Sequence, residues 1–402
     1  MSKKSLKILL TSRHSRVQSG STHQLYLLAK ELVKRGHQVY ASFKKEPGES
    51  LHPSFQPLVD IGVKLELFRF TKLKYKHTLP ELLRLKSFLW QEQFDVVNTF
   101  GGTDLSNIIA AIPGVFIPVL IAYRGLAEPL DFFNSIKYRL PLVKKVIANS
   151  EAVKRIMMKS GKIPEKKIAV VYGGFDLDKF KPDIGGEKIR REFGIPESAP
   201  VVIIIAHLKF WHEHRKGGFY FVQACEKVLK QRQDTRFLLV GKVDREKFEE
   251  IASPALKRAS ILTGYRTDIP ELLSASDLVV NASLSEGLAG VIREGMAMAK
   301  PVVATDIDGT PELVKPSETG ILVPPKNPDE LARAILTIVN NPGLGRAMGA
   351  QGRKIVEQLC DNQKRVDQYE RIYFEEYEKA TRVRHTLLHW KYWRVNSYKE
   401  QG

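Results

Sequence analysis

The chain has 402 residues, of which 43% are hydrophobic and 27% are charged, and its formal net charge at pH 7 is +18. This length and apolar content allow two domains with substantial cores and exclude disorder along the whole chain. The two cysteines, Cys225 and Cys360, exclude a disulfide scaffold and fit a reducing compartment, so we expect a cytoplasmic protein.

The positive charge is concentrated in the first half of the chain. Residues 1–180 carry a net charge of +14, residues 181–380 are neutral, and residues 381–402 carry +4. This distribution predicts that the first half faces something anionic. The densest basic segment, 64–86, interleaves cations with leucine, phenylalanine and tyrosine, which suits lipid head groups, an acidic acceptor or nucleic acid. Because no nucleic-acid motif accompanies it, we expect a membrane or an anionic glycan and no nucleic acid, with a solvated surface as the plain alternative.

In chain order, the first elements form a βαβ unit. A strand at 7–10 is followed by a polar loop at 11–22, a helix with one apolar stripe that ends at Gly36, and a strand at 38–41. The loop carries Gly20, whose backbone N–H groups we expect near a diphosphate or an acceptor. The loop lacks a full GxGxxG, so a helix start without a ligand is an equal alternative.

Alternating helices and strands continue to residue 148 and predict a parallel sheet covered on both faces. The expected elements are a helix at 82–89 and strands at 96–98, 119–122 and 146–148. Residues 105–123 carry no charge and approach the length of a membrane span. Pro113, Gly114 and Pro118 divide this stretch into a helix end, a turn and a buried strand, so we do not expect a spanning helix.

A second doubly wound unit begins with the apolar strand 201–205. Arg215 and Lys216 follow at the mouth of that sheet, where they would neutralise a leaving nucleoside diphosphate without magnesium. After a strand at 237–240, Arg266, or its neighbour Tyr265, could stack on the base of a nucleotide. A strand at 278–280 then leads into a loop that carries Glu286.

Two carboxylates, Glu286 and Glu294, flank a loop-to-helix junction. Gly287 and Gly290 let the backbone approach a ligand, and the N–H groups of Leu288, Ala289 and Gly290 favour an anion. Together these features suggest a nucleotide-sugar site. We expect Glu294 to accept hydrogen bonds from the hydroxyls of the nucleotide's ribose, and Glu286 to face the transferred sugar. The alternative is that both are solvated charges beside an ordinary turn.

From Ser285 to Glu312 the sequence resembles the retaining GT-B glycosyltransferases of family 4, in its Ser-Glu-Gly loop, its Glu-x7-Glu pair and its Pro-Val-Val-Ala-Thr strand. The resemblance extends to about Ala380. It implies an α/β fold of two Rossmann-like doubly wound domains that face each other across a cleft. The implied parts are an acceptor-binding domain at 1–182, a nucleotide-sugar-binding domain at 183–360, a crossover helix at 361–380 and a basic aromatic tail at 381–402.

The resemblance further implies transfer of a sugar from a nucleoside-diphosphate sugar, with a UDP-sugar favoured, and retention of configuration. In similar enzymes a Lys-Gly with a nearby Arg grips the pyrophosphate, which Lys216 and Arg215 match. The family needs no obligatory metal and no cofactor, so we expect the two Asp-x-Asp pairs, at 176–178 and 306–308, to be caps rather than metal ligands. The chain departs from the family at Asp308, which adds negative charge near the proposed diphosphate.

The cationic acceptor domain predicts an anionic or lipid-linked glycan acceptor, such as lipopolysaccharide, and peripheral contact with the inner face of the cytoplasmic membrane. The tail could anchor in that membrane or pack on the first domain. From residue 355 to about 379 we expect one charged helix that returns to the first domain. The alternative functions are a GT-B sugar-nucleotide epimerase and a non-catalytic binding protein.

Overall fold

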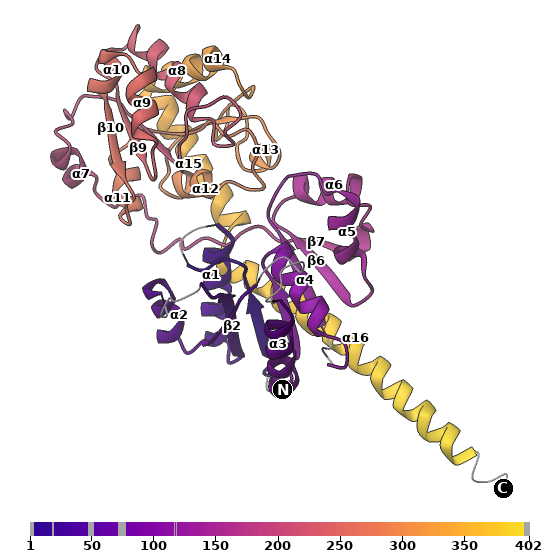
Figure 1. Ribbon diagram of the computed structural model, residues 1–402. Helices are drawn as coiled ribbons and strands as arrows, with labels where there is room; N and C mark the ends of the chain where they lie inside the picture. Colours follow the sequence, from indigo (N-terminus) through magenta and orange to yellow (C-terminus); the bar gives the residue numbers. More distant parts are fainter. Residues whose placement is uncertain are drawn as a thin grey trace.

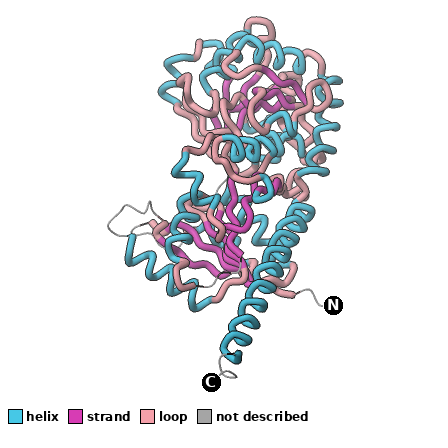
Figure 2. The backbone as a smooth tube through the Cα atoms, turned by 90° about the vertical axis from the view of Figure 1, so that its right-hand side faces the viewer, coloured by secondary structure: helices cyan, strands magenta, loops and turns pink. Residues whose placement is uncertain are grey.

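The computed structural model of the protein describes residues 4–17, 20–46, 52–70, 78–115, 117 and 119–397, with side chains up to residue 382 in the last helix. The chain forms two lobes, each built on its own parallel sheet (Figures 1 and 2). Of the basic segment 64–86, residues 71–77 lie outside the described residues, as do residues 398–402 of the tail.

The first lobe has a seven-stranded parallel sheet in the order β3-β2-β1-β4-β5-β6-β7. Its strands are β1 (Lys7–Thr11), β2 (Gln38–Lys44), β3 (Lys64–Phe68), β4 (Val96–Thr99), β5 (Val119–Arg124), β6 (Val143–Ala148) and β7 (Ile168–Val170). The central strands are almost wholly apolar, as burial on both faces requires.

Helices cover both faces of this sheet and enclose two separate hydrophobic clusters. One face is covered by α3 (Thr78–Glu92), α4 (Gly102–Ala111), α5 (Phe132–Arg139) and α6 (Glu151–Lys159). The other is covered by α1 (Gly20–Lys34), η1 (Pro53–Phe55), α2 (Gln56–Asp60) and the long helix α16 (Asn362–Ser397). The short η2 (Glu165–Lys167) leads into β7.

The second lobe repeats the plan with a six-stranded parallel sheet in the order β10-β9-β8-β11-β12-β13. Its strands are β8 (Val201–Ile205), β9 (Arg236–Val240), β10 (Ser260–Gly264), β11 (Leu278–Asn281), β12 (Val302–Thr305) and β13 (Gly320–Val323). On one face lie α8 (Gly218–Leu229), α9 (Arg245–Ile251), α10 (Pro254–Ala259) and α14 (Pro328–Val339). On the other lie α7 (Glu187–Glu192), α11 (Ile269–Ser274), α12 (Gly290–Ala297), α13 (Thr310–Leu313) and α15 (Pro342–Leu359).

The expectation of one helix from residue 355 to about 379 was wrong, because α15 ends at Leu359 and α16 begins at Asn362. The chain returns to the first lobe at this break. The break lies beside the passage, residues 171–186, by which the chain leaves the first lobe. There the N–H of Phe175 donates to the carbonyl oxygen of Cys360 at 2.9 Å, and Phe175 bridges to Asp361. The two crossings between the lobes therefore lie side by side.

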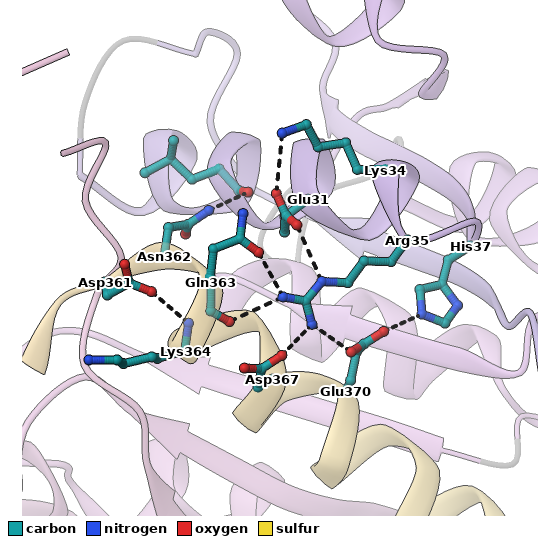
Figure 3. A network of polar contacts seen from close by, with 11 residues as sticks. Glu31, Lys34, Arg35, His37, Asp361, Asn362, Gln363, Lys364, Asp367 and Glu370 are labelled. Atoms are coloured by element: carbon teal, nitrogen blue, oxygen red, sulfur yellow. Dashed lines mark hydrogen bonds and ion pairs between the residues drawn. The ribbon is translucent and has the colours of Figure 1, made fainter. Parts of the chain in front are cut away.

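Helix α16 docks on the first lobe through a charged network around Arg35 and His37 (Figure 3). The Arg35 guanidinium donates to Asp367 at 2.6 Å and to Glu370 at 2.7 Å. The N–H of Leu6 donates to Nδ1 of His37, so the other ring nitrogen carries the hydrogen and donates to Glu370 at 2.9 Å. Beyond this docking site α16 stays helical to Ser397 and projects past the lobe (Figure 1).

The described residues between 105 and 123, which leave out 116 and 118, form most of α4, a turn at 113–114 and the buried strand β5, as Pro113 and Gly114 predicted. Across the described part of the chain, no helix combines the length and the apolar character that crossing a membrane requires.

Candidate functional site

The candidate site lies where the second sheet changes winding direction. Strands β8 and β11 are hydrogen-bonded neighbours, but the helices that follow them, α8 and α12, pack on opposite faces of the sheet. The loops after the two strands therefore diverge at their carboxyl ends, which is where doubly wound sheets bind ligands. The loop after β8, residues 206–217, and the loop after β11, residues 282–289, lie at this edge of the sheet.

The cations of the first loop are set in place by Gly217. This residue has φ +64° and forms the N-cap of α8. A Cβ there would overlap the carbonyl oxygen of Ala282 after β11, so only glycine fits. The N–H of Leu284 donates to the carbonyl oxygen of Arg215 at 2.7 Å and ties the two loops together.

Arg215, Lys216 and Glu286, which the sequence analysis assigned to a nucleotide-sugar site, meet at this edge of the sheet. The Lys216 ammonium is bonded to Oε1 of Glu286, and Nη1 of Arg215 lies 3.5 Å from Oε2. The hydroxyl of Ser283 also donates to Oε1, at 3.0 Å. Glu286 is only 8% exposed, so its charge is held by these partners rather than by solvent. The reading of Glu286 as an isolated solvated charge is therefore wrong.

Glu294 lies in α12 and presents an unpaired carboxylate over the start of that helix. A Cβ built on Gly290 would be 3.9 Å from Oε1 of Glu294, which places this oxygen beside the first turn. Within the described residues its carboxylate has neither a hydrogen bond nor an ion pair. The side chain is half-buried, and desolvation raises the pKa of Glu294 although the charges of Arg293 and Lys179 lower it. A partly desolvated carboxylate without a partner gains more stabilisation from hydroxyl donors than one that is already hydrogen-bonded.

The backbone between the two carboxylates faces the first lobe. Helix α12 has Ala289 as its N-cap, with no side-chain capping bond to its first N–H groups. Leu288 and Ala289 are buried in the core of the second lobe and anchor this loop. A Cβ on Gly287 would overlap the carbonyl oxygen of Gly125, which follows β5 of the first lobe, so glycine is required there too. The loop therefore sits at the seam between the lobes.

Arg293 ties α12 to the passage between the lobes. Its Nη1 donates to the carbonyl oxygen of Gly173 at 2.7 Å, and Nε2 of Gln24 in α1 donates to that of Gly174 at 2.9 Å. A Cβ on Gly173 would lie 2.7 Å from the Arg293 nitrogen, so the guanidinium lies directly against the backbone here. Gly20, with φ +55°, begins α1 about one turn before Gln24.

Arg266 is already engaged by two carboxylates. Its guanidinium donates to Glu192 at 2.6 Å and to Asp268 at 2.6 Å, and it lies 5.6 Å from the ring centre of Phe193. Its neighbour Tyr265 is 69% exposed. Contact of either residue with a base stays a prediction, as does the contact of Gly20 with a ligand.

Asp308 has a role that the sequence analysis missed. Its Oδ2 accepts the N–H of Glu286 at 2.9 Å, so its charge holds the loop that carries Glu286. Its φ of +42°, which Asp and Asn tolerate better than most residues, is the local signal of a tight turn before Gly309. Within the described residues no group of three His, Cys, Asp or Glu side chains could hold a metal ion. Metal independence stays a prediction.

Comparison with known proteins assigns both lobes to glycosyltransferases. Residues 18–179 match the family model Glycosyltransferase Family 4, and residues 199–341 match Glycosyl transferases group 1. The chain belongs to the glycosyltransferases.

Two curated relatives show the range of reactions among proteins similar to this glycosyltransferase. The UDP-Gal:alpha-D-GlcNAc-diphosphoundecaprenol alpha-1,3-galactosyltransferase of Escherichia coli is 26% identical over 74% of this chain and 79% of its own length. The N-acetyl-alpha-D-glucosaminyl L-malate synthase of Bacillus anthracis is 27% identical over 71% of this chain and 68% of its own.

Solved structures confirm the predicted GT-B fold. A glycosyltransferase from Rickettsia africae has a TM-score of 0.80 at 24% identity and covers 92% of this chain and 98% of its own. Anabaena HepE in complex with UDP has a TM-score of 0.77 at 22% identity and covers 92% of this chain and 100% of its own. Two Rossmann-like lobes with 7 and 6 parallel strands are thus a shared architecture.

Proposed function

We propose that this glycosyltransferase moves a sugar, with retention of configuration, from a UDP-sugar to a hydroxyl of an anionic or lipid-linked envelope glycan. The observation that carries the proposal is the convergence of Arg215, Lys216 and Glu286 at the switch point of the second sheet, with the unpaired Glu294 in the adjoining helix. The names of the E. coli relative and of a HepE complex with UDP-glucose support a UDP-sugar donor.

Each group of the site has one task in this proposal. Glu294 accepts hydrogen bonds from the ribose diol, and the N–H groups at the start of α12 contact the diphosphate. Glu286 orients the sugar and balances the two cations in the ligand-free site. When the diphosphate binds, it shares the Lys216 ammonium with Glu286, so the positive charge needed at the leaving group is already in place.

The reaction breaks the bond between the anomeric carbon and the diphosphate oxygen and forms one to the acceptor oxygen on the same face. The acceptor proton passes to the departing diphosphate oxygen, so the proposal needs no separate general base and no metal. Arg215 and Lys216 stabilise the negative charge that develops on the diphosphate. Positioning of both substrates in the seam between the lobes supplies the rest of the rate gain.

The first lobe supports a lipid-linked acceptor. Besides its net positive charge, it exposes apolar side chains in α5, where Phe132 is 64% and Phe133 is 81% exposed. The guanidinium of Arg139 lies 5.1 Å from the Phe132 ring centre. Helix α5 follows the loop that starts at Gly125. Gly125 lies next to Gly287 of the loop at 282–289, which we call the donor loop. Apolar side chains beside cations at this place suit a lipid surface with negative head groups, at the inner face of the cytoplasmic membrane.

Binding of UDP to variants tests the donor site. We expect Lys216→Ala and Glu294→Ala each to weaken UDP binding at least tenfold, or about 1.4 kcal/mol, in titration calorimetry. Lys230→Ala and Glu318→Ala change exposed residues of the same types elsewhere on the second lobe and should leave the affinity unchanged. If the first pair stays within about twofold of the parent, the donor site is wrongly assigned.

Product analysis then tests the reaction. Incubation with a UDP-sugar and a lipid-linked acceptor should yield an α-linked product by NMR, also after treatment with a chelator. Conversion of the UDP-sugar into an epimer without any acceptor would show an epimerase instead. UDP binding with no turnover of any donor would show a non-catalytic binding protein.

A further inference from the structure

A carboxylate of the second lobe caps a helix of the first lobe. Glu312 of α13 accepts the N–H of Glu151 at 2.9 Å with Oε2 and the N–H of Ala152 at 2.7 Å with Oε1. These are the first two residues of α6. The Tyr172 hydroxyl also donates to Oε2, at 2.9 Å. Burial and this bond raise the pKa of Tyr172, which keeps the phenol protonated as a donor. One side chain thus accepts from two N–H groups of the first lobe and from Tyr172, which lies in the passage between the lobes and packs on the core of the second.

The first two N–H groups of helix α6 depend on this contact for their acceptors. The first N–H groups of a helix have no partner inside the helix, and negative charge is favoured beside them. Within its own lobe, α6 is capped by Ser150, whose hydroxyl oxygen accepts from Val153 at 3.2 Å. The N–H groups of Glu151 and Ala152 are satisfied by the opposite lobe. Separation of the lobes would leave them to water.

The segment that ends with Glu312, residues 308–312, also contacts the donor loop. Asp308 accepts the N–H of Glu286, as described above. A Cβ on Gly309 would overlap the carbonyl oxygen of Gly287 and would lie 3.2 Å from the Cβ of Ser150. Residues 308–312 therefore contact the donor loop, at Glu286 and Gly287, and the start of α6.

We infer that Glu312 is a positioning residue that couples the closure of the lobes to the seating of the donor loop. The inference rests on the donor site proposed above. Closure brings the Glu312 carboxylate onto α6, and segment 308–312 then fixes the loop of Glu286 and Gly287 against the first lobe. Opening removes the two hydrogen bonds that Glu312 accepts from α6 and releases the loop of Glu286 and Gly287 from the first lobe. Glu312 does not contact the donor itself.

The variant Glu312→Gln tests this coupling, because its amide keeps one acceptor oxygen but turns an NH₂ group toward the helix start. We expect UDP affinity within twofold of the parent, because Lys216 and Glu294 are untouched. The kcat should fall at least tenfold. The radius of gyration from small-angle X-ray scattering should increase, both without ligand and with UDP. Glu312→Asp keeps the charge on a side chain one methylene shorter and should recover part of both effects.

Ser150→Ala is the matched control, since it removes a cap of α6 that comes from the same lobe. We expect it to lower the Tm while kcat and the radius of gyration stay at parental values. The inference is overturned if Ser150→Ala reproduces the loss of kcat, or if Glu312→Gln scatters like the parent. A UDP affinity more than tenfold weaker in Glu312→Gln also overturns it, since the residue would then belong to the donor pocket. If the parent binds no UDP, the proposed function fails, whereas the scattering comparison still decides whether Glu312 closes the lobes.

Discussion

At the scale of single residues, Glu294 shows how a residue proposed to bind the donor can oppose stability. Its half-buried carboxylate has lost part of its hydration, and no partner within the described residues compensates for the loss. A Glu whose folded pKa is raised binds its proton more tightly in the folded than in the unfolded state. Its contribution to stability is therefore fully present below the unfolded pKa and is lost as the pH rises through the folded pKa. At neutral pH the ligand-free protein carries this cost.

Glu294→Gln should accordingly raise the Tm of the ligand-free protein at pH 7 while weakening UDP binding at least tenfold, or about 1.4 kcal/mol. The difference in Tm between variant and parent should shrink toward acidic pH, where the parental carboxyl is protonated. In saturating UDP the order should reverse, because a ligand stabilises the protein that binds it better. Differential scanning fluorimetry across pH, with and without UDP, measures all three. A variant that is less stable than the parent at pH 7 would contradict this account.

At the scale of elements, the docking of α16 on α1 depends on a buried charge network (Figure 3). The Glu370 side chain is 4% exposed and the Arg35 side chain is 16% exposed. If one of them is removed, water can therefore hydrate little of the charge that is left on the other. Removal of one member of a buried pair is more costly than the pair is worth, because it leaves the other charge uncompensated. The network thus fixes where the returning helix lies on the first lobe.

Arg35→Ala should lower the free energy of unfolding by about 3 kcal/mol, from the usual cost of breaking a buried pair. Urea unfolding followed by circular dichroism measures the change. Arg333→Ala removes an arginine from an exposed pair with Glu330 and should change stability by less than about 1 kcal/mol. Equal effects of the two substitutions would show that the α16 network adds no more than a surface pair.

Most of the fold could be predicted from the sequence because local patterns of apolar residues decide where the helices and strands form. The apolar run 201–205 forms β8 with the same bounds, and the stripe before Gly36 forms α1. The place of Arg215, Lys216 and Glu286 in the switch-point loops could also be predicted from the sequence, since it follows from strand order, whereas their contact with a donor stays a prediction. The roles of Asp308 and Glu312 depend on contacts between distant segments, and periodicity carries no signal for those. The periodicity after residue 355 likewise carries no signal for the helix break at 360–361, which lies beside the passage.

At the scale of the whole molecule, the two lobes differ in charge. The positive charge belongs to the first half of the chain, whereas the loops of Lys216 and Glu286 belong to the neutral half. The lobes meet where Gly287 packs on Gly125 and where Arg293 reaches Gly173, so in the proposed function a donor on the second lobe would face an acceptor on the first. Gly287 lets the two backbones approach, which a Cβ would prevent.

The apolar face of α5 gives this division a test on membranes. Burial of an exposed Phe side chain contributes on the order of 2 kcal/mol, so Phe132→Ser with Phe133→Ser should weaken binding to vesicles that contain anionic phospholipid by at least tenfold. Co-sedimentation measures the bound fraction. Leu344→Ser with Leu359→Ser is the matched control, since these side chains are 39% and 37% exposed on the second lobe, and it should bind like the parent.

Raised salt should release the parent from the same vesicles, because screening weakens the attraction of the basic lobe to their surface. UDP affinity should be the same in both double variants and the parent, since α5 lies outside the donor pocket. If the Phe132 and Phe133 variant sediments with anionic vesicles as fully as the parent, α5 is not the contact. Removal of residues 383–402 from that variant would then show whether the tail holds the protein there, since a loss of sedimentation would assign the membrane contact to the end of α16.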